Sequence, residues 1–180
     1  MRLKAAGKEA YAFEAELLLE KAAGLNRTAL FLRGEEVLSA DIMEVYEGYL
    51  SEREQGRPTQ YILGEWEFMG LPFCVGEGVL IPRGDTEVLV EQALEYIRPL
   101  GECRVLDLCA GSGCVGLAIA SHAPDARVVM GELSEGALRI CRQNIRRNGL
   151  SGRVIPMQVN ALEKPEKALG EFQCIISNPP

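Results

Sequence analysis

The chain has 180 residues, of which 47% are hydrophobic and 25% are charged, and its formal net charge at pH 7 is −7. This composition is typical of a globular protein of one or two domains with a sizeable core. Direct binding to nucleic acid is not expected, because it normally needs a basic face that neutralises many phosphates. The densest basic patch recurs at helical spacing and is interpreted as a solvated helix face: Arg139, Arg142, Arg146 and Arg147.

The chain has six cysteines and a single histidine, and no two cysteines form a CxxC pair. The sequence therefore predicts neither a zinc site nor a thioredoxin-like redox motif, and no metal is expected. Buried free thiols of a cytosolic protein are the simplest interpretation. Charges interrupt every apolar run near the start of the chain, which argues against a signal peptide or a membrane span. We therefore expect a cytoplasmic protein without membrane contacts.

The first part of the chain has the apolar spacing of helices. Apolar side chains follow a helical period over residues 7–23, and Gly24 is expected to end that helix. A short apolar stretch over 28–32 leads to a further helix, which Asp41 is expected to cap and which ends before Gly56. Residues 1–62 are predicted to form a small helical bundle.

The pattern changes after the bundle. Residues 63–83 are rich in β-formers and glycines, which predicts a β-hairpin and a connector. A helix is expected to follow, with Asp85 or Thr86 as its cap. Beyond it, strands are predicted over 103–108, 126–133, 153–159 and 172–177, with helices over 115–121 and 135–148 between the first three. This alternation predicts an α/β domain with a parallel sheet over residues 84–180.

A glycine-rich turn follows the first of these strands. Gly111, Gly113 and Gly116 match GxGxxG, and Glu132 ends the next strand about twenty residues later, where a ribose-binding acid is expected. The turn alone fits a nicotinamide or flavin nucleotide as well as it fits S-adenosylmethionine. Asp107 favours S-adenosylmethionine, because a carboxylate would repel a pyrophosphate but suits an ammonium and a sulfonium. The alternatives are that Asp107 only serves the amides of its own turn and that Glu132 is a solvated strand end.

The sequence "SNPP" follows the fourth strand of this domain. Ligands of doubly wound sheets bind outside the carboxyl ends of the strands, which is where Asn178, Pro179 and Pro180 are expected to lie. The Asn178 side-chain carbonyl and the Pro179 backbone carbonyl are two acceptors for the N–H bonds of a planar NH₂ group. Such a nitrogen is a poor nucleophile, so positioning must supply much of the rate. The alternative is a simple strand-ending turn.

Four stretches of the chain, taken together, resemble one family: residues 56–75, 79–94, 105–120 and 175–180. They resemble the HemK/PrmC protein-glutamine N-methyltransferases, which methylate the glutamine of the GGQ motif in peptide chain release factors. The last two stretches are shared with many amino-methyltransferases, whereas the first two are much more specific. The resemblance implies a Rossmann-like class I methyltransferase domain that transfers a methyl group directly from S-adenosylmethionine to an amide nitrogen, with no metal and no covalent enzyme intermediate.

The resemblance also implies the site residues. Residues of the glycine turn would wrap the methionine part of S-adenosylmethionine: Cys109, Ala110, Gly111, Ser112 and Gly113. Glu132 would bind the ribose hydroxyls, and Asn160 with Ala161 would border the adenine. Asn178 and the Pro179 carbonyl would hold the substrate amide, with Pro180 completing the motif. The helical bundle would grip the release factor.

Several positions depart from the commonest family pattern. Cys109 and Ala110 stand in place of Gly-Thr, Glu132 and Asn160 each stand in place of Asp, and Gly84 stands in place of Pro. The family continues its motif as NPPY and adds further strands, so the chain is expected to be an N-terminal fragment that is inactive by itself. Its fourth strand is expected to be an exposed apolar edge through which the chain could self-associate.

Four other functions stay open at this stage. Two share the chemistry: a glutamine methyltransferase that acts on a ribosomal protein, and an adenine-N6 DNA methyltransferase, which the acidity of the chain disfavours. A nicotinamide oxidoreductase is disfavoured by Asp107 and by the NPP motif. The last is a non-catalytic module that binds release factors through the helical bundle.

Overall fold

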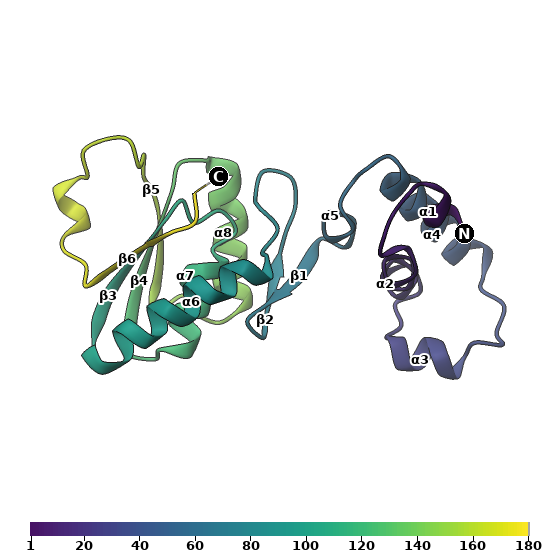
Figure 1. The fold of residues 1–180 in the computed structure, drawn as a ribbon, viewed down its shortest axis with the longest axis horizontal. Helices are drawn as coiled ribbons and strands as arrows, with labels where there is room; N and C mark the ends of the chain where they lie inside the picture. Colours follow the sequence, from purple (N-terminus) through teal and green to yellow (C-terminus); the bar gives the residue numbers. More distant parts are fainter. Residues whose placement is uncertain (180) are drawn as a thin grey trace. The chain divides into compact units, whose positions relative to one another are not determined.

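The computed structural model describes residues 1–179, and these form two compact units (Figure 1). One unit covers residues 1–64 and the other extends from Glu65 to the end of the described chain. Within the described residues, no helix is long and apolar enough to cross a membrane.

The first unit is helical. Its helices are α1 (Arg2–Ala5), α2 (Tyr11–Ala23), α3 (Arg27–Leu32), α4 (Ala40–Glu54) and α5 (Thr59–Leu63). Four of them meet in one apolar cluster, to which α1, α2, α4 and α5 contribute Leu3, Leu18, Leu50 and Ile62, whereas α3 buries no side chain. The helical period of the sequence reflects this packing, because a helix that packs on a core buries the side chains of one face.

The ends of these helices follow local side-chain chemistry. Gly24 ends α2 in the left-handed conformation, with φ of 64°, as predicted. The prediction that Asp41 caps α4 is wrong. The hydroxyl of Ser39 accepts the hydrogen bond from the Ile42 amide instead, and Asp41 lies in the first turn, where a negative charge favours the helix dipole.

The second unit begins with the predicted hairpin, formed by β1 (Glu65–Phe68) and β2 (Leu71–Cys74). Its two turn residues, Met69 and Gly70, have φ of 52° and 75°, and a type I′ turn requires positive φ at both positions. The rings of Phe68 and Phe73 are buried and meet edge to face with centroids 6.3 Å apart. The hairpin thus has an apolar face that packs into the second unit.

The rest of this unit contains a parallel sheet of four strands in the order β5-β4-β3-β6. The strands are β3 (Cys103–Leu108), β4 (Ala126–Glu132), β5 (Val154–Gln158) and β6 (Cys174–Ser177). Each lies within two residues of its predicted bounds. The predicted α/β class is confirmed, and the carboxyl end of β6 lies beside that of β3, where the register pairs Leu108 with Ser177.

One face of the sheet is covered by α6 (Gly84–Ile97), α7 (Cys114–His122) and α8 (Glu135–Arg147). Met130 of β4 shows this, because its side chain lies against Gly116 of α7 and Cys141 of α8. The prediction that Asp85 or Thr86 caps α6 is wrong. The cap residue is Arg83, which makes no side-chain capping bond, and Thr86 lies in the first turn.

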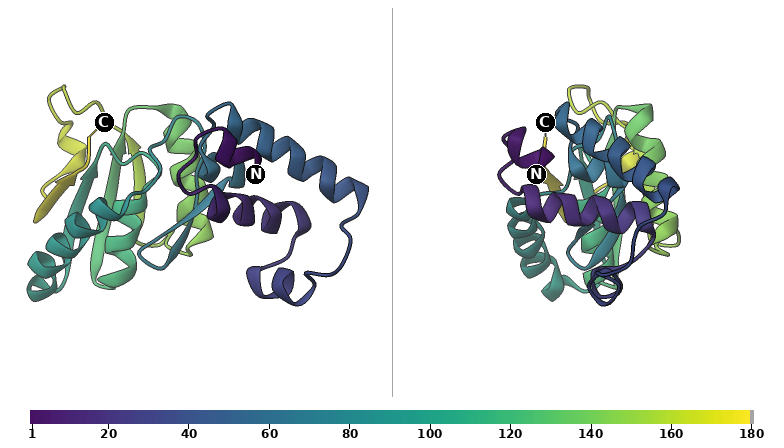
Figure 2. Two further views of the ribbon diagram at one scale, coloured as in Figure 1. Left: turned by 45° about the vertical axis from the view of Figure 1, so that its right-hand side comes forward. Right: turned by 90° about the vertical axis from the view of Figure 1, so that its right-hand side faces the viewer.

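The other face of the sheet is covered only in part. Leu106 and Val129 pack against Leu169 and Phe172, which belong to the segment between β5 and β6 that carries the short helix η2 (Lys167–Leu169). In the left view of Figure 2 this yellow segment and α8 flank the strands from opposite sides. β6 is an edge strand, and its Ile175 is 65% exposed. A further short helix, η1 (Arg98–Leu100), follows α6.

Candidate functional site

The glycine turn between β3 and α7 has a backbone that most side chains would disturb. Cys109, Gly111 and Gly113 all have positive φ, at 64°, 56° and 81°. A Cβ atom added at Gly113 would lie 3.1 Å from the sulfur atoms of Cys141 and Met130. A Cβ at Gly111 would meet nothing within 4 Å. Gly113 is therefore favoured by its positive φ and by close internal packing, whereas Gly111 borders open space that a ligand can enter.

Asp107 lies beneath this turn and is 1% exposed. Its Oδ2 accepts a hydrogen bond of 2.8 Å from the Gly116 amide, so the carboxylate does serve the backbone that follows its strand. Burial raises the pKa of Asp107 to about 7; the Gly116 bond opposes this rise and the charge of Glu132 adds to it. One hydrogen bond thus leaves the buried charge incompletely stabilised, and a nearby cation would stabilise it further.

Glu132 ends β4 and reaches the same turn. Its Oε2 accepts from the Gly111 amide at 2.9 Å, and its Oε1 accepts from the Ser134 amide at 2.8 Å. The carboxylate therefore joins the glycine turn to the start of α8 and is more than a solvated strand end. A carboxylate has about four lone-pair sites, so these two bonds leave sites for a ligand hydroxyl.

Asn178 lies at the same cavity as Asp107 and the glycine turn. The cavity measures about 40 Å³ and is lined by residues from three parts of the unit, among them Thr86, Asp107 and Asn178. The Ser177 hydroxyl donates to the Leu108 carbonyl at 2.6 Å, and the Asn178 Nδ2 donates to the Thr86 Oγ1 at 3.3 Å. These bonds hold the end of β6 beside β3 and α6. Pro179 is exposed, and Pro180 lies outside the described residues.

Asn160 and Ala161 lie apart from this cavity. Asn160 lines a hollow of about 250 Å³ together with Leu133, and both predicted adenine residues line another of about 490 Å³. The Asn160 side chain accepts from the Leu162 amide at 3.1 Å and donates to Glu163 at 2.8 Å. The structure therefore brings Asp107, the glycine turn and Asn178 to one cavity and ties Glu132 to that turn. Asn160 and Ala161 do not line this cavity but follow β5, whose end pairs with Glu132: the Val159 amide donates to the Glu132 carbonyl at 3.1 Å.

Comparison with known families divides the chain in the same way. The family described as the PrmC N-terminal domain matches residues 1–64, and the methyltransferase small domain family matches residues 84–180. The chain belongs to the methyltransferase small domain family. Because its first 64 residues match the PrmC N-terminal domain, the resemblance to the HemK/PrmC proteins is confirmed.

Curated relatives support the same family. Proteins named release factor glutamine methyltransferase from Clostridium acetobutylicum and Geobacter sulfurreducens are 38% and 40% identical to this chain. These matches cover 99% and 97% of the chain but 62% and 59% of the relatives. The chain thus spans about 60% of the length of the curated relatives it matches.

Solved structures are similar in fold. Methanocaldococcus jannaschii Trm5, determined in complex with adenosine, aligns with a TM-score of 0.52 and 19% identity over 64% of this chain and 34% of its own. The N-terminal domain of human METTL16, determined in complex with SAH, aligns with a TM-score of 0.50 and 19% identity over 62% of this chain and 47% of its own. At this identity the likeness supports the methyltransferase fold alone.

The structure adds residues to the candidate site that sequence reasoning did not place there. Leu80, Pro82 and Thr86 line the cavity from the connector and from the first turn of α6. Thr86 was considered only as a helix cap, and all three lie in the stretch 79–94, one of the two that most specifically resemble the HemK/PrmC proteins.

Asn144 of α8 was also missed, although it is fully buried behind the turn. Its Oδ1 accepts from the Cys74 amide at 2.7 Å, and its Nδ2 donates to the carbonyls of Cys74 and Ser112 at 3.0 and 2.9 Å. Asn144 therefore links the hairpin to the glycine turn. A signal was present, because Asn144 follows Leu138 and Cys141 on the apolar face of its helix.

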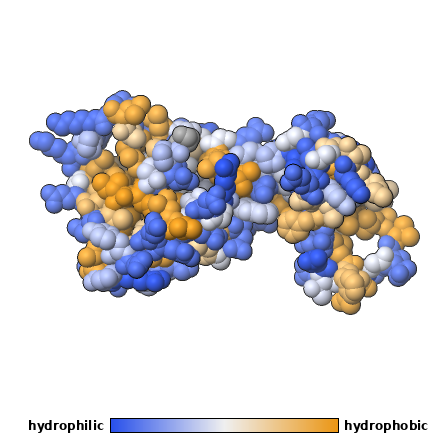
Figure 3. Space-filling model, in the orientation of Figure 1, coloured by the Kyte–Doolittle hydropathy of each residue, from blue (hydrophilic) through white to orange (hydrophobic). Residues whose placement is uncertain are grey.

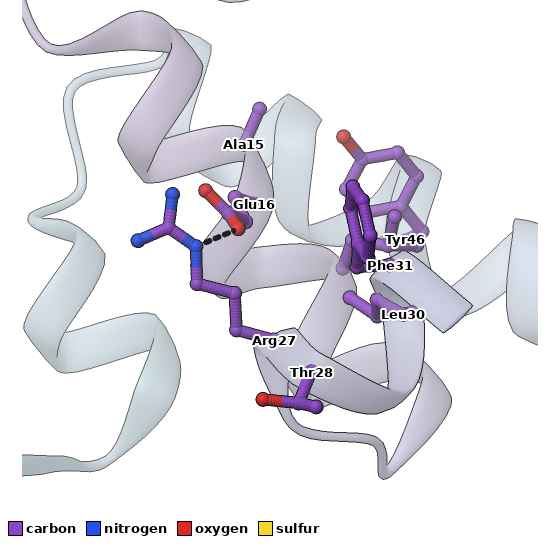
Figure 4. A pocket seen from close by; sticks show the side chains of 8 residues that line it. Ala15, Glu16, Arg27, Thr28, Leu30, Phe31 and Tyr46 are labelled. Carbon is purple, nitrogen blue, oxygen red and sulfur yellow. Dashed lines mark ion pairs between the residues drawn. The ribbon is translucent and has the colours of Figure 1, made fainter. Parts of the chain in front are cut away.

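The first unit carries a separate surface hollow of about 570 Å³ between α2, α3 and α4. Figure 4 shows Leu30, Phe31 and Tyr46 grouped on one side of it and an ion pair between Arg27 and Glu16 on the other. Phe31 and Leu32 are 85% and 77% exposed, and Figure 3 shows apolar surface over α3 at the lower right. An apolar hollow with a charged rim has the composition of a protein-binding surface.

Proposed function

We propose that this chain forms the cofactor-binding and amide-holding part of a methyltransferase that modifies the GGQ glutamine of peptide chain release factors. The observation that carries the proposal is the position of Asn178 at one cavity with Asp107 and the glycine turn. The names of the curated relatives support the substrate, and the proposal places the protein in the cytoplasm, where release factors act.

The residues of the site fit S-adenosylmethionine. Gly111 borders open space, and Asp107 is a carboxylate whose pKa is raised by burial, so a cation bound beside it would favour its ionised form. S-adenosylmethionine, when bound, supplies a methyl group carried on positively charged sulfur. Glu132 would take the ribose hydroxyls with its remaining lone pairs, and Asn160 and Ala161 would border the adenine from the neighbouring strand end.

Asn178 and Pro179 would hold the substrate glutamine. The Asn178 Oδ1 and the Pro179 carbonyl would each accept one N–H of the glutamine amide, which fixes the nitrogen in position for transfer. The nitrogen gains the methyl group and releases one proton to solvent, while the electron pair of the broken carbon–sulfur bond stays on sulfur. Pro180, which follows in the motif, would keep the chain extended at this point.

The hollow of the first unit would receive a surface of the release factor away from the GGQ motif. Its apolar lining and exposed Phe31 provide contact area, and the pair of Arg27 with Glu16 provides a polar rim. Self-association through the edge of β6 remains a prediction, which the concentration dependence of the sedimentation coefficient will test.

The experiment measures methyl transfer from labelled S-adenosylmethionine to an unmethylated release factor. The chain is assayed alone and joined after Pro180 to the part of the Clostridium acetobutylicum relative that it does not cover, with that relative as the positive control. We expect label in the GGQ peptide with the joined protein and not with the chain alone. In the joined protein, Asn178→Ala should lower the label at least about a hundredfold, because the acceptor that orients the amide is lost.

Two results would contradict the proposal. One is an absence of label with the chain alone and with the joined protein, while the Clostridium acetobutylicum relative labels the same release factor. The other is equilibrium dialysis in which the chain retains NAD and not S-adenosylmethionine.

A further inference from the structure

We propose that Thr86 is a positioning residue for the amide transfer: it fixes the rotation of the Asn178 side chain so that its oxygen is presented to the substrate. This inference rests on the proposed function and adds to it a residue from a different part of the fold. It begins from the hydrogen bond of 3.3 Å between the Asn178 Nδ2 and the Thr86 Oγ1.

An asparagine amide has two ends of nearly equal shape and opposite chemistry. Its Oδ1 accepts hydrogen bonds and its Nδ2 donates them. A substrate NH₂ group is a donor, so it is held only by an Asn178 whose Oδ1 is turned toward it. The opposite rotation would set two donors against each other and would reject the substrate. A group that distinguishes the two ends of Asn178 therefore controls the chemistry of the site.

Thr86 meets this requirement. Its hydroxyl oxygen accepts from the nitrogen end of Asn178, which leaves the oxygen end as the one that is not held by α6. Asn178 itself is exposed, so nothing about its burial would fix the amide. Thr86 is 8% exposed and β-branched, and both properties restrict its own side chain. The Thr86 hydroxyl is thus a fixed acceptor, and the side chain that it orients is the exposed Asn178.

The contact joins segments 92 residues apart and closes the cavity between α6 and β6. The Thr86 hydroxyl is available for this contact because it does not cap α6. The cap residue of α6 is Arg83, which makes no side-chain capping bond. The Thr86 amide donates to the Arg83 carbonyl at 3.0 Å, which ties the residue to the start of the helix. The position of Thr86 is therefore determined by backbone structure and does not depend on a bound ligand.

The test is made in the joined protein described above and compares Thr86→Val, which keeps the shape and removes the acceptor, with Thr86→Ser, which keeps the hydroxyl. A bond of this length between neutral groups predicts a turnover about five- to tenfold lower for Thr86→Val. The affinities for S-adenosylmethionine and for the release factor should change by less than about twofold, and Thr86→Ser should retain most of the turnover. In an Asn178→Ala background, Thr86→Val should have no further effect, because the group it orients is gone.

A second measurement does not depend on activity. In the chain labelled with ¹⁵N-asparagine, the side-chain NH₂ signals of Asn178 should show restricted motion in the wild type and in Thr86→Ser, and free motion in Thr86→Val. If the NH₂ signals respond in this way but no release factor is methylated, the proposed function fails and the contact stands. Three results would each overturn the inference. The first is equal turnover in wild type and Thr86→Val, and the second is an equal loss of turnover in Thr86→Ser and Thr86→Val. The third is a loss from Thr86→Val that persists in the Asn178→Ala background.

Discussion

The two units of the chain use their polar side chains in different ways. In the first unit the apolar cluster around Leu18 and Leu50 forms the core, and charged side chains pair at or near the surface. In the second unit the side chains of Asp107 and Asn144 are buried around the glycine turn and bond to backbone groups. A buried polar group fixes its partners in one arrangement, whereas a surface pair constrains them little. The comparison indicates that the second unit is built to hold a site and the first to offer a surface.

The largest effect is expected at Asn144. Asn144→Ala removes three hydrogen bonds and leaves backbone groups of Cys74 and Ser112 without a partner behind the turn. We expect the free energy of unfolding to fall by about 3 kcal/mol, since each unsatisfied buried group costs about 1–3 kcal/mol. Urea denaturation followed by circular dichroism measures this.

The matched control is Gln143→Ala, one residue earlier on the exposed side of α8. Its effect should stay within about 0.5 kcal/mol, as is usual for surface substitutions. Equal losses at Gln143 and Asn144 would show that the hydrogen bonds of Asn144 do not link the hairpin to the turn with any net stabilisation.

The next effect concerns pH. Burial holds the pKa of Asp107 at about 7 in the free protein, so the carboxyl is largely protonated at pH 6 and ionised at pH 8. A cationic ligand favours the ionised form and lowers this pKa, so its binding releases a proton and its affinity rises with pH. We expect S-adenosylmethionine to bind about tenfold more tightly at pH 8 than at pH 6, which is the cost of ionising a group of this pKa at pH 6. Isothermal titration calorimetry at the two pH values measures the difference.

Asp107→Asn is the control for this pH dependence. Asn keeps an oxygen that can accept from the Gly116 amide but does not ionise, so only the titration of the ligand's own amino group remains. The same pH dependence in wild type and Asp107→Asn would exclude Asp107 as its source.

The sequence predicted those features of the second unit that depend on chain order and residue type. Parallel strands end at one edge of their sheet, so Asp107 and Asn178 could be placed together from the strand pattern alone. The turn glycines could be recognised from their spacing, because Gly111 and Gly113 have positive φ, which side chains rarely adopt.

Other contacts could not be predicted, because they depend on side-chain rotamers and on distant segments. Thr86 meets Asn178 across 92 residues, and Asn144 meets Cys74 across 70. The same holds for the cap of α4, where Ser39 and Asp41 are both acceptable residues and the backbone geometry selected Ser39. The placement of Asp107, the glycine turn and Asn178 at one cavity could thus be predicted from strand order, whereas the contacts of Thr86 and Asn144 could not.

A smaller effect is expected at the surface hollow of the first unit. Phe31→Ser removes an 85% exposed aromatic ring from the hollow, which should weaken binding of the release factor by about five- to tenfold. Val37→Ser is the matched control, since Val37 is 97% exposed and does not line the hollow. Biolayer interferometry with immobilised release factor measures both. Equal losses at the two positions would assign the effect to general surface hydrophobicity.

The smallest effects are expected at two ion pairs of the first unit that differ in exposure. Arg53 donates two bonds to Glu14, at 2.8 and 3.0 Å, and the two side chains are only 16% and 17% exposed. Arg33 pairs with Glu36 at 3.0 Å, with side chains 52% and 58% exposed. We expect Arg53→Met to lower the free energy of unfolding by about 1 kcal/mol, because it breaks a two-bond contact between α4 and α2, and Arg33→Met by about 0.3 kcal/mol or less. Equal losses for Arg53→Met and Arg33→Met in urea denaturation would mean that both ion pairs behave as solvated surface pairs. The buried polar side chains of the second unit, Asp107 and Asn144, would then differ from both of these pairs.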